Sequence, residues 1–482
     1  MPRQFLPTVC LAATLAACNL APDYHPPHVD VPATYKEAGP WQPAAPSDDA
    51  PRGAWWERFG DPTLNRLEPQ IEIANPDLAA TVARYDQARA FAAEAQAGLD
   101  PQVSLGASLS ANRQSQNRPL RGAAQPNFYT ANQVAASASY EIDFWGKLRN
   151  EAKAGTALAQ ASAADLATMR LSLQSELATD YLTLRGLDAD SKLLTDTVGA
   201  YQKAVDLTQT LFLGKIVSSL DVSRAQTQLD TAKAQLSEIA SKRALMEHAT
   251  ATLVGQPASS FSIPAEVPPF TLPAVPASVP STLLQRRPDI AAAERTVAAA
   301  NDEIGVARAA FYPSFSLDLL AGFQSGGLNL LSLPNSFWSV GPDVTLPLLD
   351  GGKLDAEEAM AYARFREAGA DYRSTVLAAF QQVEDNLALL HWLGQESDDE
   401  TAGVTAAQHT LDVALNLYKQ GVSSYLEVVT AQTALLQAQQ TLLDLQTRRL
   451  TADVGLIRGL GGGWTSTDLP TEAAAVKLPA NG

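Results

Sequence analysis

Cysteine, histidine and basic residues are scarce in this chain, and each scarcity excludes a class of protein. The 482 residues include only two cysteines, Cys10 and Cys18, so a disulfide framework is excluded once the first residues are processed. The five histidines are scattered without metal-ligand spacing, and no phosphate-binding or dinucleotide-binding glycine motif is present. We therefore predict no enzyme, no catalytic residues, no metal and no cofactor. Acidic residues outnumber basic ones 52 to 35, for a net charge of −17, which argues against a nucleic-acid partner.

Proline is absent from two long windows, between Pro126 and Pro257 and between Pro347 and Pro470. Proline breaks helix interiors, and these windows are rich in strong helix formers. They predict unbroken helices over 147–213 and 353–418, each roughly 100 Å long at about 1.5 Å per residue. Helices of that length need helical neighbours. Within the second window, Asp398-Asp399-Glu400 is interpreted as a solvated break between helices.

The amino terminus has the features of an export signal. Phe5 to Ala17 is mostly apolar, is too short to span a bilayer, and ends in Leu-Ala-Ala-Cys. This ending resembles a bacterial lipobox, so we predict a signal peptide at 1–17 and lipid on Cys18. An ordinary signal cleaved elsewhere is the alternative. Asn19 follows the cysteine and favours delivery to the outer membrane, because lipoproteins held at the inner membrane often carry aspartate there.

The proline-rich residues 18–62 are predicted to form an extended strap on the folded body. Beyond them the chain repeats itself. Matches at an offset of 212 are Pro76-Asp77 with Pro288-Asp289 and Pro101 with Pro313. Matches at an offset of 206 are Gly146-Lys147-Leu148 with Gly352-Lys353-Leu354 and Leu220-Asp221-Val222 with Leu426-Glu427-Val428. A constant offset across such landmarks indicates two copies of one unit.

The two repeats are assigned to 63–256 and 288–463, joined by a linker at 257–287 and followed by a flexible tail at 464–482. Helices are expected at 77–98, 147–213 and 221–254 in the first repeat, and at 289–310, 353–418 and 427–459 in the second. In each repeat the two shorter helices together are nearly as long as the long one. They are therefore expected to stack end to end beside it, which makes a wall of antiparallel helix pairs.

Four segments change from a helical period to alternation of apolar and polar residues, at about 102–112, 133–144, 314–324 and 336–346. Each has the length of a strand that crosses an outer membrane when tilted. The alternative is a pair of soluble hairpins in the periplasm. Four strands cannot close a barrel, and open edges are not tolerated in lipid. We therefore expect a mainly α fold with a β membrane part, in which a homotrimer shares one 12-stranded barrel above a helical coiled-coil tunnel.

Several stretches resemble the TolC-like outer-membrane efflux family, in particular its lipidated branch. They include Trp55-Trp56-Glu57-Arg58-Phe59-Gly60-Asp61-Pro62, Arg286-Arg287-Pro288-Asp289-Ile290-Ala291 and Leu346-Pro347-Leu348-Leu349-Asp350-Gly351-Gly352. The resemblance covers nearly the whole chain. It implies a trimeric duct in the outer membrane of a Gram-negative bacterium, anchored by lipid and extending into the periplasm. Its partners would be a periplasmic adaptor and an inner-membrane resistance–nodulation–division pump.

The same resemblance implies that the turns at Gly214–Asp221 and Gln420–Glu427 lie at the periplasmic tip, where the family narrows to a gate. The candidate gate residues are Leu220, Asp221, Val422, Ser423, Tyr425, Leu426 and Glu427. The two acidic candidates also suit ordinary helix starts. Related ducts often have an acidic residue where this chain has Ser423, so apolar packing by Leu220, Val422, Tyr425 and Leu426 is an alternative way to close the bore.

The function expected from these features is passive conduction of drugs or other small toxic solutes to the exterior. Two alternatives within transport are a duct for type I protein secretion and a duct for metal-ion efflux. An alternative of another class is a periplasmic coiled-coil lipoprotein scaffold that conducts nothing.

Overall fold

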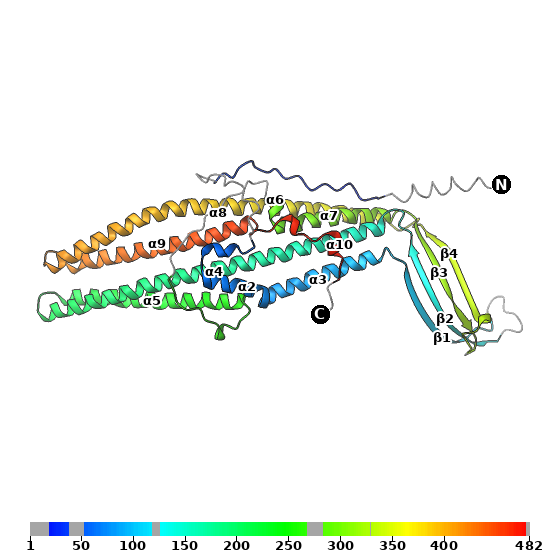
Figure 1. Ribbon diagram of the computed structural model, residues 1–482, viewed down its shortest axis with the longest axis horizontal. Coiled ribbons are helices and arrows are strands. Elements are labelled where there is room, and N and C mark those ends of the chain that lie inside the picture. Colours follow the sequence, from blue (N-terminus) through cyan, green and yellow to red (C-terminus); the bar gives the residue numbers. More distant parts are fainter. Residues whose placement is uncertain (1–18, 38–52, 118–125, 268–282, 328, 479–482) are drawn as a thin grey trace.

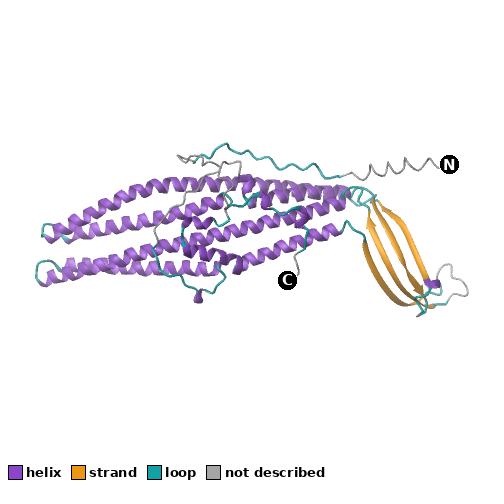
Figure 2. Ribbon diagram, in the orientation of Figure 1, coloured by secondary structure: helices purple, strands orange, loops and turns teal. Residues whose placement is uncertain are grey.

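The computed structural model describes residues 19–37, 53–117, 126–267, 283–327 and 329–478. The chain forms a long rod of helices that carries a four-stranded sheet at one end (Figure 1, Figure 2). The predicted signal peptide and Cys18 lie outside the described residues. Among the described helices, none holds a stretch that is both long and apolar enough to pass through a bilayer.

The element η1 (Trp55–Phe59) precedes the first repeat. The first repeat is formed by α2 (Pro62–Ala74), α3 (Pro76–Ala97), β1 (Gln102–Arg113), β2 (Phe128–Glu141), α4 (Lys147–Leu213) and α5 (Ser219–Leu253). A short η2 (Ala258–Ser260) follows. The long helix has the expected bounds, whereas β2 begins five residues before the expected 133 and ends at Glu141. The helix α2 was not expected from the sequence.

The short α6 (Leu283–Arg286) lies at the end of the linker. The second repeat contains α7 (Pro288–Ala309), β3 (Ser314–Ser325), η4 (Leu333–Asn335), β4 (Ser336–Thr345), α8 (Lys353–Lys419) and α9 (Tyr425–Gly459). The break expected at Asp398-Asp399-Glu400 is wrong, because α8 continues through these residues. Asp398 and Asp399 are exposed, so their charges are solvated without interrupting the helix.

Short helices stack end to end beside each long helix, and one polar side chain makes the joint in each repeat. Asn75 accepts a hydrogen bond from the Leu78 N–H and donates its amide to the Leu253 carbonyl at 2.9 Å. It therefore caps the start of α3 and the end of α5 together. In the second repeat Arg287 donates to the Gly459 carbonyl at 2.9 Å, at the corresponding joint between α7 and α9.

All four strands pair antiparallel in the order β1-β2-β3-β4. The middle pair, β2 with β3, joins the two repeats. The outer strands β1 and β4 each have one edge that no described strand covers. The helices show the same relation, because α4 packs against α7 of the other repeat as well as against α3 and α5.

The amino-terminal residues 19–37 lie along α7 and α8 of the second repeat (Figure 1). The Tyr24 hydroxyl donates to Glu294 at 2.6 Å, and the Asn301 amide donates to the Pro22 carbonyl at 2.9 Å. At the far end, the backbone N–H groups of Lys36 and Glu37 both donate to the Glu384 carboxylate. The predicted strap therefore has fixed contacts along these helices.

The flexible tail expected at 464–482 is wrong for the described residues up to 478. These residues contain η5 (Ser466–Asp468) and α10 (Glu472–Ala475). Ala475 is fully buried against Ala92 of α3 and Ala159 of α4. The Gln160 amide also donates to the Pro470 carbonyl at 2.9 Å. Small apolar side chains on the first repeat thus hold the carboxyl-terminal segment in place.

Candidate functional site

The sheet has one apolar and one polar face, and the strand register explains why. Leu105 lies opposite Ala136, Ala136 opposite Ala321, and Ala321 opposite Trp338. Leu105 is 77% exposed and Trp338 is 76% exposed. The neighbouring row, on the other face, holds Ser104, Ser137, Leu320 and Ser339. Because side chains alternate along a strand, this register gathers the apolar positions of all four strands on one side.

The polar face carries hydroxyls and carboxylates. The Ser104 and Ser137 hydroxyls are hydrogen-bonded across strands at 2.7 Å. Asp318 and Asp343 lie on the same face, on adjacent strands, and Ser316 donates to Asp318 at 2.9 Å. A strongly exposed apolar face opposite a hydroxylated one is the pattern of a sheet with lipid on one side and water on the other.

A compact joint connects the sheet to the long helix of the first repeat. The Phe144 ring packs edge-on against Phe315, and the Trp145 indole N–H donates to the Pro313 carbonyl at 2.7 Å. Arg149 forms an ion pair with Asp143 at 3.1 Å. These contacts join the start of α4 to the start of β3. They therefore fix the sheet to the helices of both repeats.

The far end of the rod consists of two helix hairpins, α4–α5 and α8–α9 (Figure 1). Both turns use the same hydrogen bonds. The Ile216 N–H donates to the Leu211 carbonyl at 2.9 Å, and the Val422 N–H donates to the Leu417 carbonyl at 3.0 Å. Ile216 and Val422 are 72% and 70% exposed. Each turn thus closes its helix and presents an apolar side chain at the tip.

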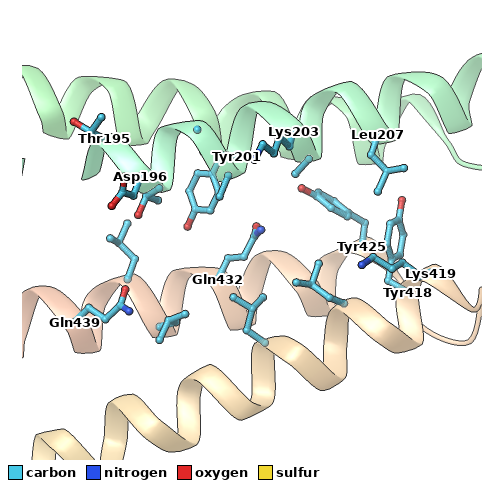
Figure 3. Close-up of a pocket in the computed structure, with 18 residues that line it drawn as sticks. Thr195, Asp196, Tyr201, Lys203, Leu207, Tyr418, Lys419, Tyr425, Gln432 and Gln439 are labelled. Atoms are coloured by element: carbon cyan, nitrogen blue, oxygen red, sulfur yellow. The ribbon is translucent and has the colours of Figure 1, made fainter. Parts of the chain in front are cut away.

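The two hairpins enclose a cavity of about 660 Å³ between α4 and the α8–α9 pair. Figure 3 shows Tyr201 of α4 and Gln432 of α9 pointing into the space between the helices. Nearer the tip, Tyr418 and Tyr425 pack with ring centroids 5.3 Å apart. Burial, with smaller effects from Tyr418, Tyr201 and Asp221, raises the pKa of Tyr425 to about 12. Tyr425 is therefore neutral at physiological pH, and the tyrosines hold the hairpins together by packing of their rings.

A second cavity of about 420 Å³ lies directly at the tip. It is lined from both hairpins, by Ser218 and Asp221 on one side and by Ser423, Ser424 and Tyr425 on the other. The Ser423 hydroxyl is buried and has no hydrogen-bond partner among the described residues. The tip is thus a place where the hairpins meet loosely, with room between polar side chains.

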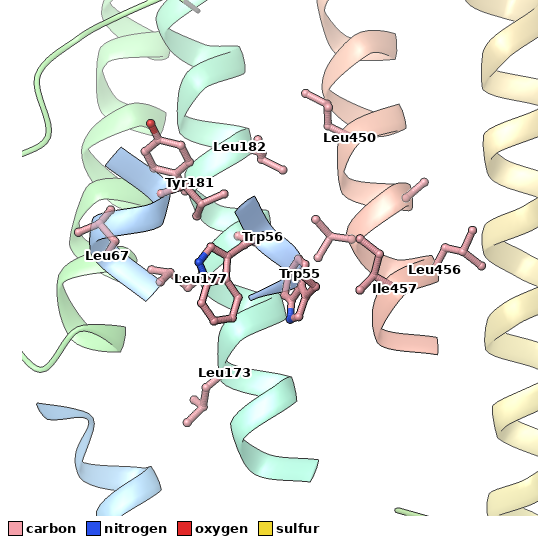
Figure 4. Packing of buried hydrophobic residues seen from close by; sticks show 14 of the residues in the cluster. Trp55, Trp56, Leu67, Leu173, Leu177, Tyr181, Leu182, Leu450, Leu456 and Ile457 are labelled. Atoms are coloured by element: carbon pink, nitrogen blue, oxygen red, sulfur yellow. The ribbon is translucent and has the colours of Figure 1, made fainter. Parts of the chain in front are cut away.

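The middle of the rod is held more firmly. Trp55 and Trp56 lie between α4 and α9, against Leu177 and Ile457 (Figure 4). Beside them Arg185 is 2% exposed and donates to Asp188 at 2.9 Å and to the Pro264 carbonyl at 2.8 Å. A buried and fully hydrogen-bonded charge pair of this kind fixes geometry strongly, because removing one partner leaves a buried charge.

The structure separates the seven candidate gate residues into two groups. Asp221, Ser423 and Tyr425 line the cavity at the tip. Four others are exposed: Leu220, Val422, Leu426 and Glu427. Asp221 forms a capping box with Ser218 and an ion pair with Arg224 at 3.7 Å, so its first role is to start α5. Tyr425 is only 3% exposed and packs between the two hairpins of this chain.

Tyr201 and Tyr418 also belong to this site, although neither is among the residues predicted for it from the sequence. The sequence signal for these residues is a local enrichment in tyrosine, because Tyr201, Tyr418 and Tyr425 all lie in the segments next to the two turns. Within the described residues, no three His, Cys, Asp or Glu side chains gather as a metal site.

The chain matches the family model described as "Outer membrane efflux protein" over residues 68–256 and 279–462. It is 31% identical over 486 aligned residues to the probable efflux pump outer membrane protein TtgC of Pseudomonas putida, covering 99% of this chain and 100% of the relative. It is 30% identical to the pyoverdine export outer membrane protein OpmQ of Pseudomonas aeruginosa, covering 97% and 98%. The outer-membrane channel OprN superposes with a TM-score of 0.85 at 28% identity, over 93% of this chain and 100% of that one. The chain therefore belongs to the outer membrane efflux protein family.

Proposed function

We propose that three copies of this chain form the passive exit duct of a tripartite efflux system in the outer membrane. The observation that carries the proposal is the sheet with one apolar face, one polar face and two uncovered edges, at one end of paired helical hairpins. A sheet with open edges in lipid must find partners. Three copies would supply twelve strands, enough for a barrel with a water-filled interior.

In this assembly the apolar face meets lipid and the polar face lines the passage. The carboxylates of Asp318 and Asp343 would then lie along the passage wall. Their negative field would raise the local concentration of cationic solutes and slow anionic ones. The chain makes and breaks no bond in this scheme, and the energy comes from an inner-membrane resistance–nodulation–division pump that a periplasmic adaptor connects to the duct.

The gate is proposed to lie at the hairpin tips. The exposed Leu220, Val422 and Leu426 would narrow the bore where three copies converge, and the adaptor would bind nearby. Opening would separate the two hairpins of each copy, a movement for which the two cavities leave space. Lipid on Cys18 would add an anchor next to the barrel, with the residues that follow it lying along the second repeat.

The test is conductance of the purified full-length protein in planar bilayers, together with its mass in detergent. We expect three-chain particles and discrete channels that favour cations. A stable single copy without conductance would instead support the coiled-coil scaffold. Accumulation of small toxic organic compounds, a siderophore and divalent metals in a deletion strain, alongside secretion of a reporter protein, would then separate drug efflux from metal efflux and protein secretion.

A further inference from the structure

The two hairpins of the sheet have the same register when their residues are matched through the internal repeat. Ser104 pairs with Ser137 in the first hairpin. Adding the repeat offsets of 212 and 206 gives Ser316 and Asp343, and these two residues also pair. The repeat therefore relates the strands residue by residue: β1 corresponds to β3, and β2 corresponds to β4.

The contact between the repeats can then serve as a template for a contact between copies. Within one chain β2 pairs with β3, and this pairing joins Ala135 to Gly322 and Gln133 to Gln324. The uncovered edge of β4 corresponds to the edge of β2 that meets β3. The uncovered edge of β1 corresponds to the edge of β3 that meets β2.

We propose that β4 of one copy pairs with β1 of the next copy in the register of β2 with β3. This joins Gly341 to Ser110 of the next copy and Ser339 to Asn112 of the next copy. The inference rests on the proposed assembly and goes beyond it, because closure of a barrel by three copies permits several registers that differ by two residues.

The local residues fit this register. Ala135 and Gly322 approach so closely that a side chain at Gly322 would lie 2.7 Å from the Ala135 methyl. The equivalent pair, Gly341 with Ser110, again contains one glycine and one small residue. On the other face the register places Leu346 opposite Leu105 of the next copy, and both are exposed in the single chain. Such cross-strand apolar pairs stabilise a sheet.

The helices support the same interface. Ala164 of α4 and Ala291 and Ala292 of α7 are buried together where the repeats meet. Their repeat equivalents are Ala370 of α8 and Ala79 and Ala80 of α3, and all three are exposed in the single chain. Small residues allow helices to approach closely, and these three lack only the partner that their equivalents have. A neighbouring copy placed through the β4–β1 pairing would bring α8 against α3.

Cysteine pairs can measure the register. The Ile142 N–H donates to the Phe315 carbonyl at 2.8 Å, so these two residues form a hydrogen-bonded pair. Because hydrogen-bonded and non-hydrogen-bonded pairs alternate along an antiparallel ladder, Gln133–Gln324 and Ala135–Gly322 are non-hydrogen-bonded pairs. Their Cα atoms should be about 4.5 Å apart, which suits a disulfide. A register changed by two residues would place the same side chains roughly 7–8 Å apart on a diagonal. That separation is too large for a disulfide.

Four substitutions make two test pairs and two matched controls: Ser339→Cys, Gly341→Cys, Ser110→Cys and Asn112→Cys. All four positions lie on the polar face, and a side chain at Gly341 would meet nothing within 4 Å. The full-length double variants are oxidised in membranes and run on gels without reductant. We expect two-chain and three-chain products for Ser339 with Asn112 and for Gly341 with Ser110, reversed by reductant. The pairs Ser339 with Ser110 and Gly341 with Asn112 should remain single chains, as should the parent with its native cysteines.

The outcomes separate the register from the assembly. Cross-linking in either control pair but in neither test pair would overturn the proposed register. Particles of three chains that cross-link in none of the four pairs would overturn it too, while leaving the duct intact. If every variant and the parent were single chains in detergent and in membranes, the proposed function would fall and the register with it.

Discussion

Lys215 and Gly421 occupy equivalent positions in the two hairpin turns, and both have a left-handed backbone, with φ of 59° and 73°. Glycine adopts this conformation freely, whereas lysine pays a conformational cost of about 1 kcal/mol. We therefore expect Lys215→Gly to stabilise its turn by roughly 0.5–1 kcal/mol and Gly421→Ala to destabilise the other by about 1 kcal/mol. Hydrogen exchange of the Ile216 and Val422 amides measures both, with the unaltered turn of each variant as its control. The prediction would be contradicted if the Ile216 amide in Lys215→Gly and the Val422 amide in Gly421→Ala both exchanged at the rates of the unaltered chain.

Glu68 of α2 should make stability depend on pH. Its side chain is fully buried, both carboxylate oxygens lack a hydrogen-bond partner among the described residues, and burial raises its pKa from 4.5 to about 9. Below the unfolded pKa both states hold the proton, and between roughly pH 4.5 and 9 only the folded state holds it. The free energy of unfolding must therefore fall as pH rises through this window.

Glu68→Leu should remove this part of the slope and raise the free energy of unfolding at pH 8 by about 2–4 kcal/mol. Denaturant unfolding at a series of pH values is the measurement. The control is Glu72→Leu on the same helix, where the carboxylate is partly exposed and paired with Arg170. It should change stability by only about 0.5 kcal/mol. A slope that survives in Glu68→Leu would show that another group is responsible.

Adjacent residues of β1 should differ sharply in their tolerance of charge. Leu105→Arg places a guanidinium on the apolar face and should cost about 2–4 kcal/mol of insertion free energy near the membrane centre. Ser104→Arg places it on the polar face, where water solvates it. Gel migration of heated and unheated outer-membrane fractions compares the assembled species. Equal yields for the two variants would argue that this sheet is not in lipid.

Ala370 tests the helical part of the contact between copies. Ala370→Arg should prevent assembly, because a bulky charge would replace a methyl group at a close helix crossing. Ala402→Arg on the same helix is the control, since its repeat equivalent Asp196 is 64% exposed in the first repeat. Light scattering in detergent should give three chains for Ala402→Arg and single chains for Ala370→Arg. Assembly of both variants would place this crossing outside the interface.

Tyr425 is expected to restrain the tip. Tyr425→Ala removes a ring that is 3% exposed and should loosen the hairpin pair by about 3–5 kcal/mol, as for other buried aromatic residues. The expected results are faster hydrogen exchange in the first turns of α9 and larger mean conductance. Leu426→Ala, at an exposed neighbour, should leave exchange in these turns unchanged. Unaltered conductance in Tyr425→Ala would mean that separation of the hairpins does not limit the opening.

Local sequence rules predicted the long helices, the strands and the stacked short helices well, because each is repetitive and long. The helices α4 and α8 begin directly after Gly146 and Gly352. Both glycines have a positive φ, which glycine adopts readily. The helix α2 was missed because Pro69 lies inside it. Burial of Leu64 and Ile71 in the central core outweighs the hydrogen bond that proline removes.

The tip was harder to predict than the fold. Leu220 and Val422 are exposed, as their place in a turn suggests, but the positions of Tyr201 and Tyr425 depend on how two distant hairpins pack. No periodicity within one helix specifies that packing. For the same reason the carboxyl-terminal segment was assigned as flexible, since its contacts, such as those of Ala475 with Ala92 and Ala159, are made with residues far earlier in the chain.

The uncovered edges of β1 and β4 have a consequence for biogenesis. A newly exported copy carries two rows of unpaired backbone groups and an apolar sheet face in water, which is a template for aggregation. In the proposed assembly, completion of the sheet requires encounter with two further copies, so its rate should depend on their concentration in the periplasm. We expect the strands to need protection from aggregation until that encounter, whereas the helical rod already has its own buried core.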